Sequence, residues 1–479
     1  MVRSTKIVAT LGPASSDPSV LERMMRAGVD VVRLNFSHGT AEDHLRRAEM
    51  VKEIGRKVGR TVAVMCDLQG PKIRVGRFAN GKTVLQKGKH FILDAACELG
   101  NDERVGLDYP DLPRDVAEGA VLLLDDGRIM LEVTSVRGDE VHTVVRHGGV
   151  LSNNKGINKQ GGGLTAPALT AKDMEDIRTA VKTDADYLAV SFPKSGADMY
   201  MARELMRAAG GKAFLIAKIE RAEAVEPKIL MDIMNGSDGI MVARGDLAVE
   251  VGDAAVPALQ KRMIRMAREA NKLTITATQM LESMVASPVP TRAEVSDVAN
   301  AVLDGTDAVM LSAESASGMY PVEAIMAMDR ICIQAEQSQP LSLDQDFLNR
   351  VFTRVDQSIA MGALFTAFHL KIKAIAALTE SGSTALWMSR LNCGVPIYAL
   401  TTQTSTRFRC ALLRDTYPLA VKYVGHDREE LLQEAENVLV SNGLVKDGDL
   451  IVLTIGEPIG KAGGTNTMKI VRVGEHRKK

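Results

Sequence analysis

The sequence contains few cysteines and no long hydrophobic run. Its five cysteines are scattered and form no CxxC pair, a pattern that disfavours disulfides and zinc sites and is typical of reduced thiols. No stretch approaches about 18 consecutive apolar residues, so we predict no transmembrane helix. The N-terminus has no long apolar core of the kind found in signal peptides. We therefore expect a cytoplasmic protein with no membrane partner.

An excess of charge of either sign is also absent. Lysine and arginine together number 59, against 60 aspartates and glutamates, for a net charge of −1. This balance argues against a nucleic-acid binder or a protein that binds anionic membranes. The phosphate-binding motif GxxxxGK[ST] is missing, which argues against a P-loop enzyme. With 46% hydrophobic and 25% charged residues, the chain is typical of a soluble globular protein, and its length suggests about three domains.

Strand-like and helix-like segments alternate in two stretches of the chain. Three strands with intervening helices are predicted before residue 70, and five more after residue 170. The predicted strands lie at 6–10, 30–37, 61–67, 187–192, 214–219, 239–243, 273–278 and 308–312. Eight strand–helix units in about this length predict a closed (β/α)8 barrel of the α/β class.

The remaining segments predict two further domains. Between the third and fourth strands, short alternating segments separated by Gly and Asp predict an inserted all-β domain. After about residue 340 strands and helices alternate again, which predicts an open α/β domain. Its predicted strands lie at 373–378, 396–400, 420–423 and 450–454, after a helix from roughly 346 to 369. We thus assign 1–69 and 171–340 to the barrel, 70–170 to an inserted β-barrel domain and 341–479 to the C-terminal domain.

Charged and polar side chains stand where the predicted barrel strands end. Lys218 and Glu220 close a buried apolar run, and their spacing on a strand points them to the same side. Buried charges are costly unless they are paired or used, so this pair is either a structural salt bridge or part of a site. Polar residues at the other strand ends favour a site, because such barrels carry their chemistry there. These residues are Arg33, Asn35, Ser37, His38, Asp67, Arg74, Arg244, Gly245, Asp246, Thr278, Gln279, Ser312 and Glu314.

The residue types at these strand ends indicate phosphoryl transfer. Glu220 and Asp246 offer two carboxylates from adjacent strands, and Mg²⁺ is usually held by such a pair together with substrate oxygens and water. Thr278 has a hydroxyl suited to a proton relay. Without a Cys/His nucleophile pair, the set favours catalysis by positioning and charge neutralisation. Four cations are available for an anionic substrate such as a phosphate. They are Arg33, Arg74, Lys218 and Arg244.

Eight motifs, in order along the whole chain, carry a family resemblance. They are KIVATLGPAS (6–15), VVRLNFSHG (31–39), DLQGPKIR (67–74), LIAKIE (215–220), MVARGDL (241–247), TATQMLESM (276–284), PTRAEVSDVANAVLDGTDAVMLSAESA (290–316) and GGTNTMKI (463–470). In these motifs, in their spacing and in its predicted architecture, the chain resembles the pyruvate kinases. The resemblance implies that phosphoenolpyruvate and ADP are converted to pyruvate and ATP, with Mg²⁺, or Mn²⁺, as the cofactor.

The resemblance also implies roles for residues of the site. Lys218 would stabilise charge on the transferring phosphoryl group and on the enolate. Glu220 and Asp246 would bind the Mg²⁺ that bridges enzyme and substrate. The backbone at Gly245 and the hydroxyl of Thr278 would hold the substrate carboxylate, and Thr278 is a candidate for the proton route to the enolate carbon.

Further residues would contact the phosphate and the nucleotide. Arg33 would bind the phosphate of the substrate. Arg74 and Lys155 would lie on the nucleotide side, which His38 and Asn35 would line. The inserted domain would be a lid that closes over the nucleotide and excludes water.

The chain departs from the family pattern beside the site. Asn35, Ser37 and Asp67 form an oxygen cluster for K⁺ in this family, and members that need K⁺ tend to carry Glu where this chain has Lys72. The ammonium of Lys72 can supply the positive charge that K⁺ would bring, so we expect activity without K⁺. Arg221 stands where the family often has Asn, and we expect that change to have little effect.

The C-terminal domain carries a loop that the family uses to bind an allosteric phosphate. Backbone N–H groups and hydroxyls at the start of a helix can bind an anion, although an ordinary capped turn would have the same pattern. The candidate effectors are fructose 1,6-bisphosphate, a sugar monophosphate and AMP, and the scarcity of basic partners favours a monophosphate. Family members form homotetramers. The loop residues are Thr379, Ser381, Gly382, Ser383 and Thr384.

Two other functions remain open from the sequence. A barrel enzyme of the aldolase or mutase type, acting on phosphoenolpyruvate or a keto acid, could share the Mg²⁺ carboxylates but would need neither the lid nor Lys155. A non-catalytic effector-binding protein on this fold would be expected to have lost site residues, whereas Lys218, Glu220, Asp246 and Thr278 are all present.

Overall fold

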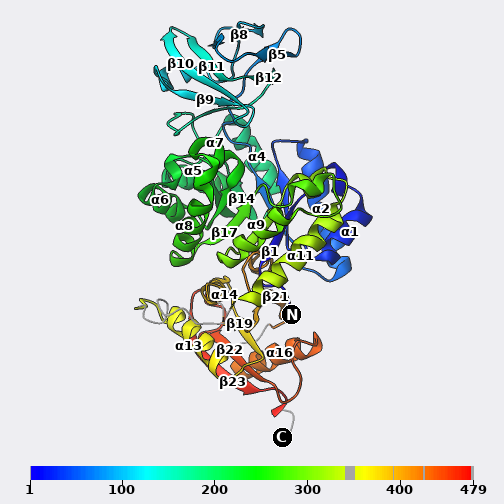
Figure 1. The fold of residues 1–479 in the computed structure, drawn as a ribbon. Helices are drawn as coiled ribbons and strands as arrows, with labels where there is room; N and C mark the ends of the chain where they lie inside the picture. The colour runs from blue at the N-terminus through cyan, green and yellow to red at the C-terminus, as the bar shows by residue number, and fades with distance from the viewer. Residues whose placement is uncertain (1, 340–350, 392, 424–426, 476–479) are drawn as a thin grey trace.

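The computed structural model describes residues 2–339, 351–391, 393–423 and 427–475. Three parts follow one another along the molecule (Figure 1). A layer of β-strands stands at one end, a ring of strands and helices forms the middle, and a sheet with helices forms the other end. The predicted fold class is confirmed.

The middle part is a closed barrel of eight strands, in the order β1-β18-β17-β16-β15-β14-β3-β2 around the ring. All neighbouring strands run parallel. Each strand overlaps one predicted from the sequence. The strands are β1 (Lys6–Thr10), β2 (Val31–Asn35), β3 (Ala63–Asp67), β14 (Tyr187–Val190), β15 (Phe214–Ile219), β16 (Gly239–Ala243), β17 (Leu273–Ala277) and β18 (Ala308–Leu311).

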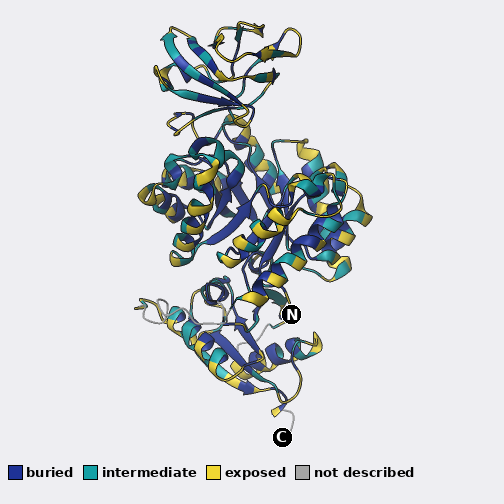
Figure 2. Ribbon diagram, viewed as in Figure 1, coloured by how far each residue is buried: buried dark blue, intermediate teal, exposed yellow. Residues whose placement is uncertain are grey.

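Hydrophobic runs explain why these segments form a barrel. Every residue of β1, β3, β16 and β17 is buried. This is expected of strands that helices cover on one face and that line the filled barrel interior with the other. Inside, Val8, Met65, Ile216 and Met241 belong to one hydrophobic cluster. Figure 2 shows these strands as a buried ring within a shell of partly exposed helices.

The helices around the barrel begin and end at defined signals. Thr40 and Thr170 cap α2 and α4 by accepting hydrogen bonds from the backbone N–H groups of Asp43 and Asp173, the usual role of an N-cap hydroxyl. The α-helices are α1 (Pro18–Ala27), α2 (Ala41–Val58), α4 (Ala171–Lys182), α5 (Gly196–Ala208), α6 (Pro227–Gly236), α7 (Arg244–Val251), α8 (Val256–Glu269), α9 (Arg292–Leu303), α10 (Ala313–Ala316) and α11 (Pro321–Ser338). Single 3-10 turns are η1 (Pro13–Ser15), η2 (Glu223–Val225), η3 (Asp253–Ala255) and η4 (Glu282–Val285).

The insert between β3 and α4 consists of short, mostly antiparallel strands. Its main sheet has the order β13-β9-β10-β11-β6-β8, and smaller sheets pair β12 with β5 and β4 with β7. It has a hydrophobic core of its own, which includes Phe91 and Leu131, and one helical turn, α3 (Leu112–Asp115). The strands are β4 (Arg77–Phe78), β5 (Lys82–Leu85), β6 (His90–Asp94), β7 (Leu99–Gly100), β8 (Arg104–Val105), β9 (Val121–Leu124), β10 (Ile129–Arg137), β11 (Glu140–His147), β12 (Gly149–Ser152) and β13 (Ile157–Lys159).

The C-terminal part is a five-stranded sheet of order β21-β20-β19-β22-β23, in which only β23 is antiparallel to its neighbour. Its strands are β19 (Ala374–Leu378), β20 (Ile397–Thr401), β21 (Thr416–Ala420), β22 (Leu450–Gly456) and β23 (Thr465–Arg472). Its helices are α13 (Val355–His369), α14 (Ser383–Ser389), α15 (Thr404–Cys410) and α16 (Arg428–Ser441).

Two predictions for this sheet were wrong. The strand expected at 420–423 ends at Ala420 and begins at Thr416. It contains Pro418, which is tolerated because β21 is an edge strand and needs no N–H on its free side. The edge strand β23 was not predicted, since its polar and apolar residues lack a long hydrophobic run. The predicted helix start near residue 346 lies outside the described residues.

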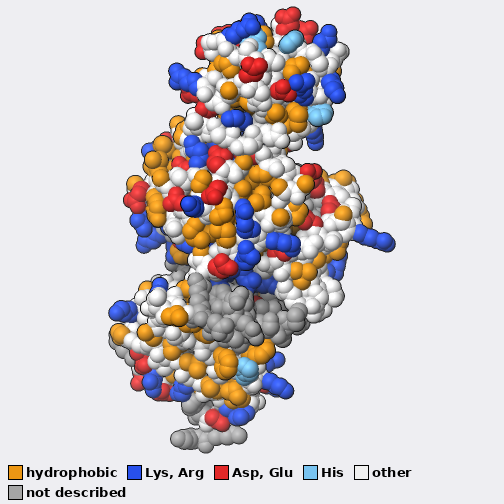
Figure 3. Space-filling view, turned by 60° about the vertical axis from the view of Figure 1, so that its left-hand side comes forward, with side chains coloured by type: hydrophobic (Ala, Val, Ile, Leu, Met, Phe, Trp, Pro, Cys, Tyr) orange, Lys and Arg blue, Asp and Glu red, His pale blue; other side chains and the backbone are white. Residues whose placement is uncertain are grey.

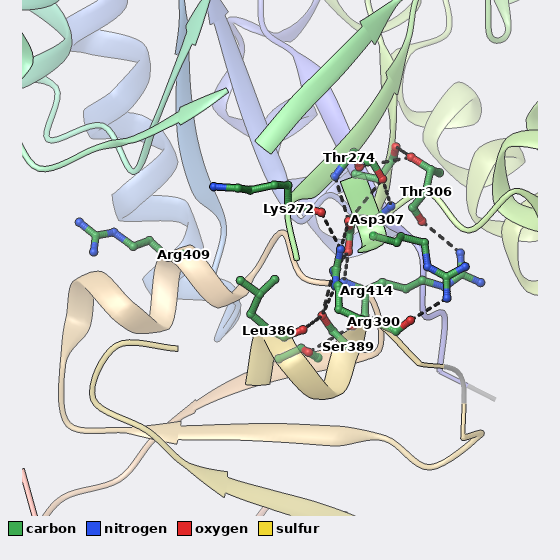
Figure 4. Close-up of polar contacts among 12 residues, drawn as sticks. Lys272, Thr274, Thr306, Asp307, Leu386, Ser389, Arg390, Arg409 and Arg414 are labelled. Carbon is green, nitrogen blue, oxygen red and sulfur yellow. Dashed lines mark hydrogen bonds and ion pairs between the residues drawn. The ribbon is translucent and has the colours of Figure 1, made fainter. Parts of the chain in front are cut away.

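A buried ion-pair cluster joins the barrel to the C-terminal sheet (Figure 4). Asp307, just before β18, is 1% exposed and binds the Arg390 guanidinium with both carboxylate oxygens. The same carboxylate accepts the backbone N–H of Thr274 at 2.9 Å and that of Arg414 at 3.2 Å. Arg390 also donates to the carbonyl of Lys272 at 2.8 Å. The pair is therefore well supplied with hydrogen bonds, as a buried ion pair must be to offset its desolvation.

The outer surface carries charges of both signs. On the face shown in Figure 3, basic and acidic side chains are interspersed over the insert and the barrel. Among the described residues, no helix combines the length and the apolar character needed to cross a bilayer.

Candidate active site

Lys218 lies at the end of β15 between two carboxylates. Its Nζ is 2.9 Å from Glu220 Oε1 and 3.4 Å from Asp67 Oδ1, and it donates a hydrogen bond to Ser191 Oγ at 2.8 Å. Burial alone would lower the pKa of Lys218, but the two carboxylates outweigh it and raise the pKa above the ordinary value. The side chain is therefore a fixed positive charge at the carboxyl end of the barrel.

Glu220 and Asp246 are the two carboxylates that could hold a metal. Burial raises the pKa of Glu220 to about 7, while the Lys218 ammonium opposes this rise and the Asp246 carboxylate adds to it. A divalent cation would relieve the repulsion between the two carboxylates, so the pair fits Mg²⁺, which substrate oxygens and water commonly complete. Within the described parts of the chain, no group of three or more His, Cys, Asp or Glu could hold a metal alone.

Arg33 and Asp67 extend this charge network across β2 and β3. Arg33 Nε donates to Asp67 Oδ2 at 2.6 Å, and Nη1 donates to Thr10 Oγ1 at 3.0 Å. No partner of Nη2 is found in the described residues, so this nitrogen can still bind an anion. Asn35 and Ser37 lie at the same strand end, where Asn35 Oδ1 accepts the Ser37 N–H at 3.1 Å. The structure thus brings the predicted phosphate arginine and the oxygen cluster together.

Thr278 and Gly245 meet at the ends of neighbouring strands. The Gly245 N–H donates to Thr278 Oγ1 at 2.8 Å, and this hydroxyl donates to the Ala277 carbonyl at 2.7 Å. Thr278 and Gln279 both have positive φ, at 64° and 52°. Such conformations cost energy in residues other than glycine and persist where the surroundings hold them.

Arg244 holds this strained turn. It donates to the carbonyls of Thr278 at 2.6 Å and Gln279 at 3.0 Å, and its Nη1 binds Asp297 at 2.8 Å. The side chain is 6% exposed. We predicted Arg244 as one of four cations for an anionic substrate, whereas its donors here bind the turn that carries Thr278.

Of the residues predicted on the nucleotide side, Arg74 and Lys155 lie on the insert and Asn35 and His38 lie on the barrel. The backbone of Arg74 pairs with Gly156 in an isolated bridge, next to Lys155, whose Nζ binds Asp125 at 2.6 Å. His38 is exposed at the edge of the barrel, after β2. Lys72 Nζ lies 4.0 Å from Asp246 Oδ1. In the described residues Lys72 has no contact with the cluster of Asn35, Ser37 and Asp67.

The predicted effector loop lies at the other end of the molecule. Gly382 has a φ of 85°, and its N–H donates to Thr379 Oγ1 at 2.9 Å. Ser381 Oγ donates to Ser383 Oγ at 3.2 Å, and the hydroxyls of Thr384 and Thr465 are 2.6 Å apart. The loop borders a cavity of about 200 Å³ between α16 and the ends of β19, β20 and β22.

Two contact residues of the site were missed. Ser191 binds Lys218, and Thr10 binds Arg33. Both stand at or just beyond the ends of predicted barrel strands, so the rule that identified the other residues could have found them. Ser312 and Glu314, which that rule did identify, bind each other locally, since the Ser312 N–H donates to Glu314 at 2.7 Å.

Comparison with known proteins decides the family. A family model described as pyruvate kinase, barrel domain, matches residues 2–325, and one described as pyruvate kinase, alpha/beta domain, matches residues 357–471. The chain belongs to the pyruvate kinase family. Pyruvate kinase II of Salmonella typhimurium is 51% identical over 476 residues, which cover 98% of this chain and 99% of that protein.

Other pyruvate kinases match over a similar length. That of Haemophilus influenzae is 50% identical over 461 residues, or 95% of this chain and 96% of that protein. That of Geobacillus stearothermophilus is 42% identical over 98% of this chain and 80% of its own length. The predicted pyruvate kinase activity is confirmed by this similarity, and the aldolase-type and non-catalytic alternatives find no support. Pyruvate kinases use Mg²⁺, which agrees with the pair Glu220 and Asp246.

The role of Arg244 in holding the turn leads to a first prediction. Arg244→Lys keeps the charge but loses the planar fork that reaches several acceptors at once. Because small displacements of catalytic groups are costly, we expect kcat/KM for pyruvate kinase activity to fall about 10²-fold. Arg265→Lys, on the exposed side of α8, is the matched control and should leave activity unchanged. Unchanged kcat/KM in Arg244→Lys would contradict this role.

Proposed function

We propose that the chain transfers the phosphoryl group of phosphoenolpyruvate to ADP, with Lys218 at the centre of the reaction. The observation that carries the proposal is the fixed charge of Lys218 beside Glu220 at the carboxyl end of the barrel, in a chain that is 51% identical to a pyruvate kinase over 476 residues. Positive charge aimed at a transferring phosphoryl group stabilises the transition state without reorganisation.

Other side chains bind and orient the substrate. Arg33 Nε and Nη1 are held by Asp67 and Thr10, which leaves Nη2 to donate to the phosphate of the substrate. In the substrate-free structure the Gly245 N–H donates to Thr278 Oγ1 at 2.8 Å and this hydroxyl donates to the Ala277 carbonyl, and both donors would turn to the carboxylate of the bound substrate. When the bond from phosphorus to the enol oxygen breaks, the enolate carbon needs a proton, and we assign Thr278 to the route that supplies it.

Glu220 and Asp246 hold the divalent cation. Mg²⁺ or Mn²⁺ bound there would neutralise part of the negative charge of the substrate. Glu220 is kept in place by the ammonium of Lys218 on one oxygen and by the backbone N–H of Phe192, at 2.9 Å, on the other. Asp246 lies in the first turn of α7, directly after Gly245.

The inserted domain acts as a lid that covers the nucleotide. Arg74 and Lys155 lie side by side near its base and supply cations for the phosphates of ADP. His38 and Asn35 line the barrel side. Closure of such a lid excludes water and strengthens the electrostatic interactions inside.

A coupled assay of pyruvate formation tests the central role of Lys218. With phosphoenolpyruvate, ADP and Mg²⁺, Lys218→Met should lose about 10³-fold in kcat, because the donor aimed at the transferring group is removed. Lys228→Met makes the same chemical change at an exposed side chain in the first turn of α6 and should be as active as the unmodified chain. Turnover without ADP, or an active Lys218→Met variant, would overturn the assignment.

We propose further that Lys72 replaces K⁺. Its ammonium lies 4.0 Å from Asp246 and so brings a permanent positive charge to the edge of the site where the metal binds. A fixed positive charge near Asp246 can replace the electrostatic contribution of a bound monovalent cation.

The requirement for K⁺ is measured by replacing it with tetramethylammonium at constant ionic strength. We expect the unmodified chain to keep its rate within about twofold, and Lys72→Glu to lose about tenfold, or about 1.4 kcal/mol, and to recover with K⁺. Lys82→Glu, at an exposed position of β5, changes the charge by the same amount and is the control. A large loss of rate in the unmodified chain would contradict the proposal.

The cavity beside the loop at 379–384 is our proposed effector site. Its lining includes hydroxyls from Thr379, Thr401 and Thr402 and the carboxylate of Glu380, and none of the described lining residues is Lys or Arg. This lining suits one phosphate better than two, so we favour a sugar monophosphate or AMP over fructose 1,6-bisphosphate. Helix α14 leads from this loop to Arg390, which binds Asp307 of the barrel. Assembly into a homotetramer is proposed from family membership alone.

A charge added to the loop tests the effector site. Ser383→Asp should repel a phosphate and weaken activation by AMP or a sugar monophosphate about tenfold, within the usual range of allosteric coupling. Basal activity should not change, since the loop is at the opposite end of the barrel from Lys218. Ser405→Asp, exposed on α15, is the control. Equal activation of Ser383→Asp and Ser405→Asp would place the effector site elsewhere. Stronger activation of the unmodified chain by fructose 1,6-bisphosphate than by AMP or a sugar monophosphate would overturn the preference for a monophosphate.

A further inference from the structure

Arg221 is a buried arginine directly after Glu220, with 4% of its surface exposed. Its Nε donates to the carbonyl of Phe192 at 3.0 Å, and its Nη1 donates to the carbonyl of Leu164 at 3.0 Å. Cζ lies 5.7 Å from the centre of the Phe192 ring. One rigid guanidinium therefore joins two segments that are far apart in the sequence.

Phe192 connects Arg221 to the metal-binding carboxylate. It has a positive φ of 55°, and its N–H donates to Glu220 Oε2 at 2.9 Å. The N–H of this one residue thus orients Glu220, while its carbonyl is held by Arg221. A strained residue keeps such a conformation only while its surroundings hold it, and Arg221 is part of those surroundings.

Leu164 lies on the segment that leads from the insert back to the barrel. Three consecutive glycines precede it, with φ of 80°, 76° and 85° at Gly161, Gly162 and Gly163. Glycine adopts such angles readily, so this run can serve as a hinge. After the glycines the chain is tied to the barrel twice, by Arg221 at Leu164 and by Lys194 Nζ, which donates to the Thr165 carbonyl at 3.0 Å.

Both connections of the insert meet Asp246, one of the two proposed metal carboxylates, in one small cavity. Lys72 and Leu164 line it from the entering and leaving segments, and Phe192, Arg221 and Asp246 line it from the barrel. Its volume of about 20 Å³ has room for about one water molecule and none for a substrate. The residues around this cavity therefore contact one another and not a substrate.

The counterion of Arg221 is distant for a buried charge. The nearest carboxylate, that of Glu223, is 3.7 Å away, and most of the guanidinium bonds go to backbone carbonyls. Burying a cation without a close partner is costly. A neutral side chain would avoid that cost but could not reach both carbonyls, which indicates that holding the two segments together is what the arginine does.

We infer that Arg221 is a positioning residue that couples the hinge of the inserted domain to the metal site: movement at Leu164 is passed through the guanidinium and Phe192 to Glu220. The inference rests on the proposed role of Glu220 as a Mg²⁺ ligand. It differs from our expectation that Arg221, in place of the Asn often found there, changes little, and the experiment below decides between the two. Metal binding and closure of the insert are thereby linked within one chain of contacts.

The test measures metal binding and hinge motion separately, without turnover. Mn²⁺ binding to the substrate-free protein is followed by electron paramagnetic resonance, and hinge motion by hydrogen exchange of the segment 160–166. Arg221→Lys and Arg221→Gln should each weaken Mn²⁺ binding about tenfold, as loss of a group that orients a metal ligand commonly does, and should raise exchange in the segment. Arg221→Lys keeps the positive charge, so the test can still be carried out if Arg221→Gln fails to fold.

Lys194→Met is the matched control, because it removes the other tie to the same segment without touching Phe192 or Glu220. It should raise exchange and leave Mn²⁺ binding unchanged. If the Arg221 variants behave like Lys194→Met, Arg221 is only a tether and the inference fails. Unchanged exchange and unchanged binding would also overturn it.

Glu220→Gln separates this outcome from failure of the proposed function. It should reduce Mn²⁺ binding more than either Arg221 variant does. If Glu220→Gln binds Mn²⁺ as tightly as the unmodified chain, the metal assignment itself is wrong, and the coupling inferred from it falls as well.

Discussion

The alternation of buried charges at one mouth of the barrel is the constraint on which the site depends. Arg33, Asp67, Lys218 and Glu220 follow one another with contacts of 2.6, 3.4 and 2.9 Å. Each charge is costly to bury alone and is offset by its neighbours, so removal of one member leaves another uncompensated. The network keeps Lys218 charged and immobile, and a fixed charge is what phosphoryl transfer needs.

The two ends of the barrel are used for different purposes. The carboxyl ends of the strands carry the charged site and the inserted domain, while Arg390 and Arg414 of the C-terminal part contact the opposite end of the barrel. There Asp307 joins Arg390 to the segments before β17 and β18. β17 and β18 lead at their far ends to Thr278 and Ser312. These two strands therefore connect the interface with the site. An effector bound beside α14 would have a short mechanical route to the barrel.

The two connections of the inserted domain each approach one of the carboxylates that we propose as metal ligands. On the entering segment Lys72 lies 4.0 Å from Asp246, and on the leaving segment Leu164 is bound by Arg221, the residue after Glu220. Lys72 and Arg221 both depart from the pattern expected of the family. In our proposal, a change at this hinge alters both closure of the insert and metal binding, because the same few contacts serve both.

The sequence by itself determined the barrel, the existence of the inserted and C-terminal domains, and the residues gathered at the strand ends, because buried parallel strands have continuous hydrophobic runs and their polar ends stand out. It placed the edge strand β21 at 420–423 instead of Thr416–Ala420 and did not reveal the edge strand β23, whose pattern is weak. Only the tertiary structure decided that Arg244 holds a backbone turn, that Lys72 lies beside Asp246 and that Arg221 bridges Phe192 and Leu164. A long cationic side chain can reach several acceptors, and which of them it binds depends on segments distant in sequence that the fold brings within about 3 Å.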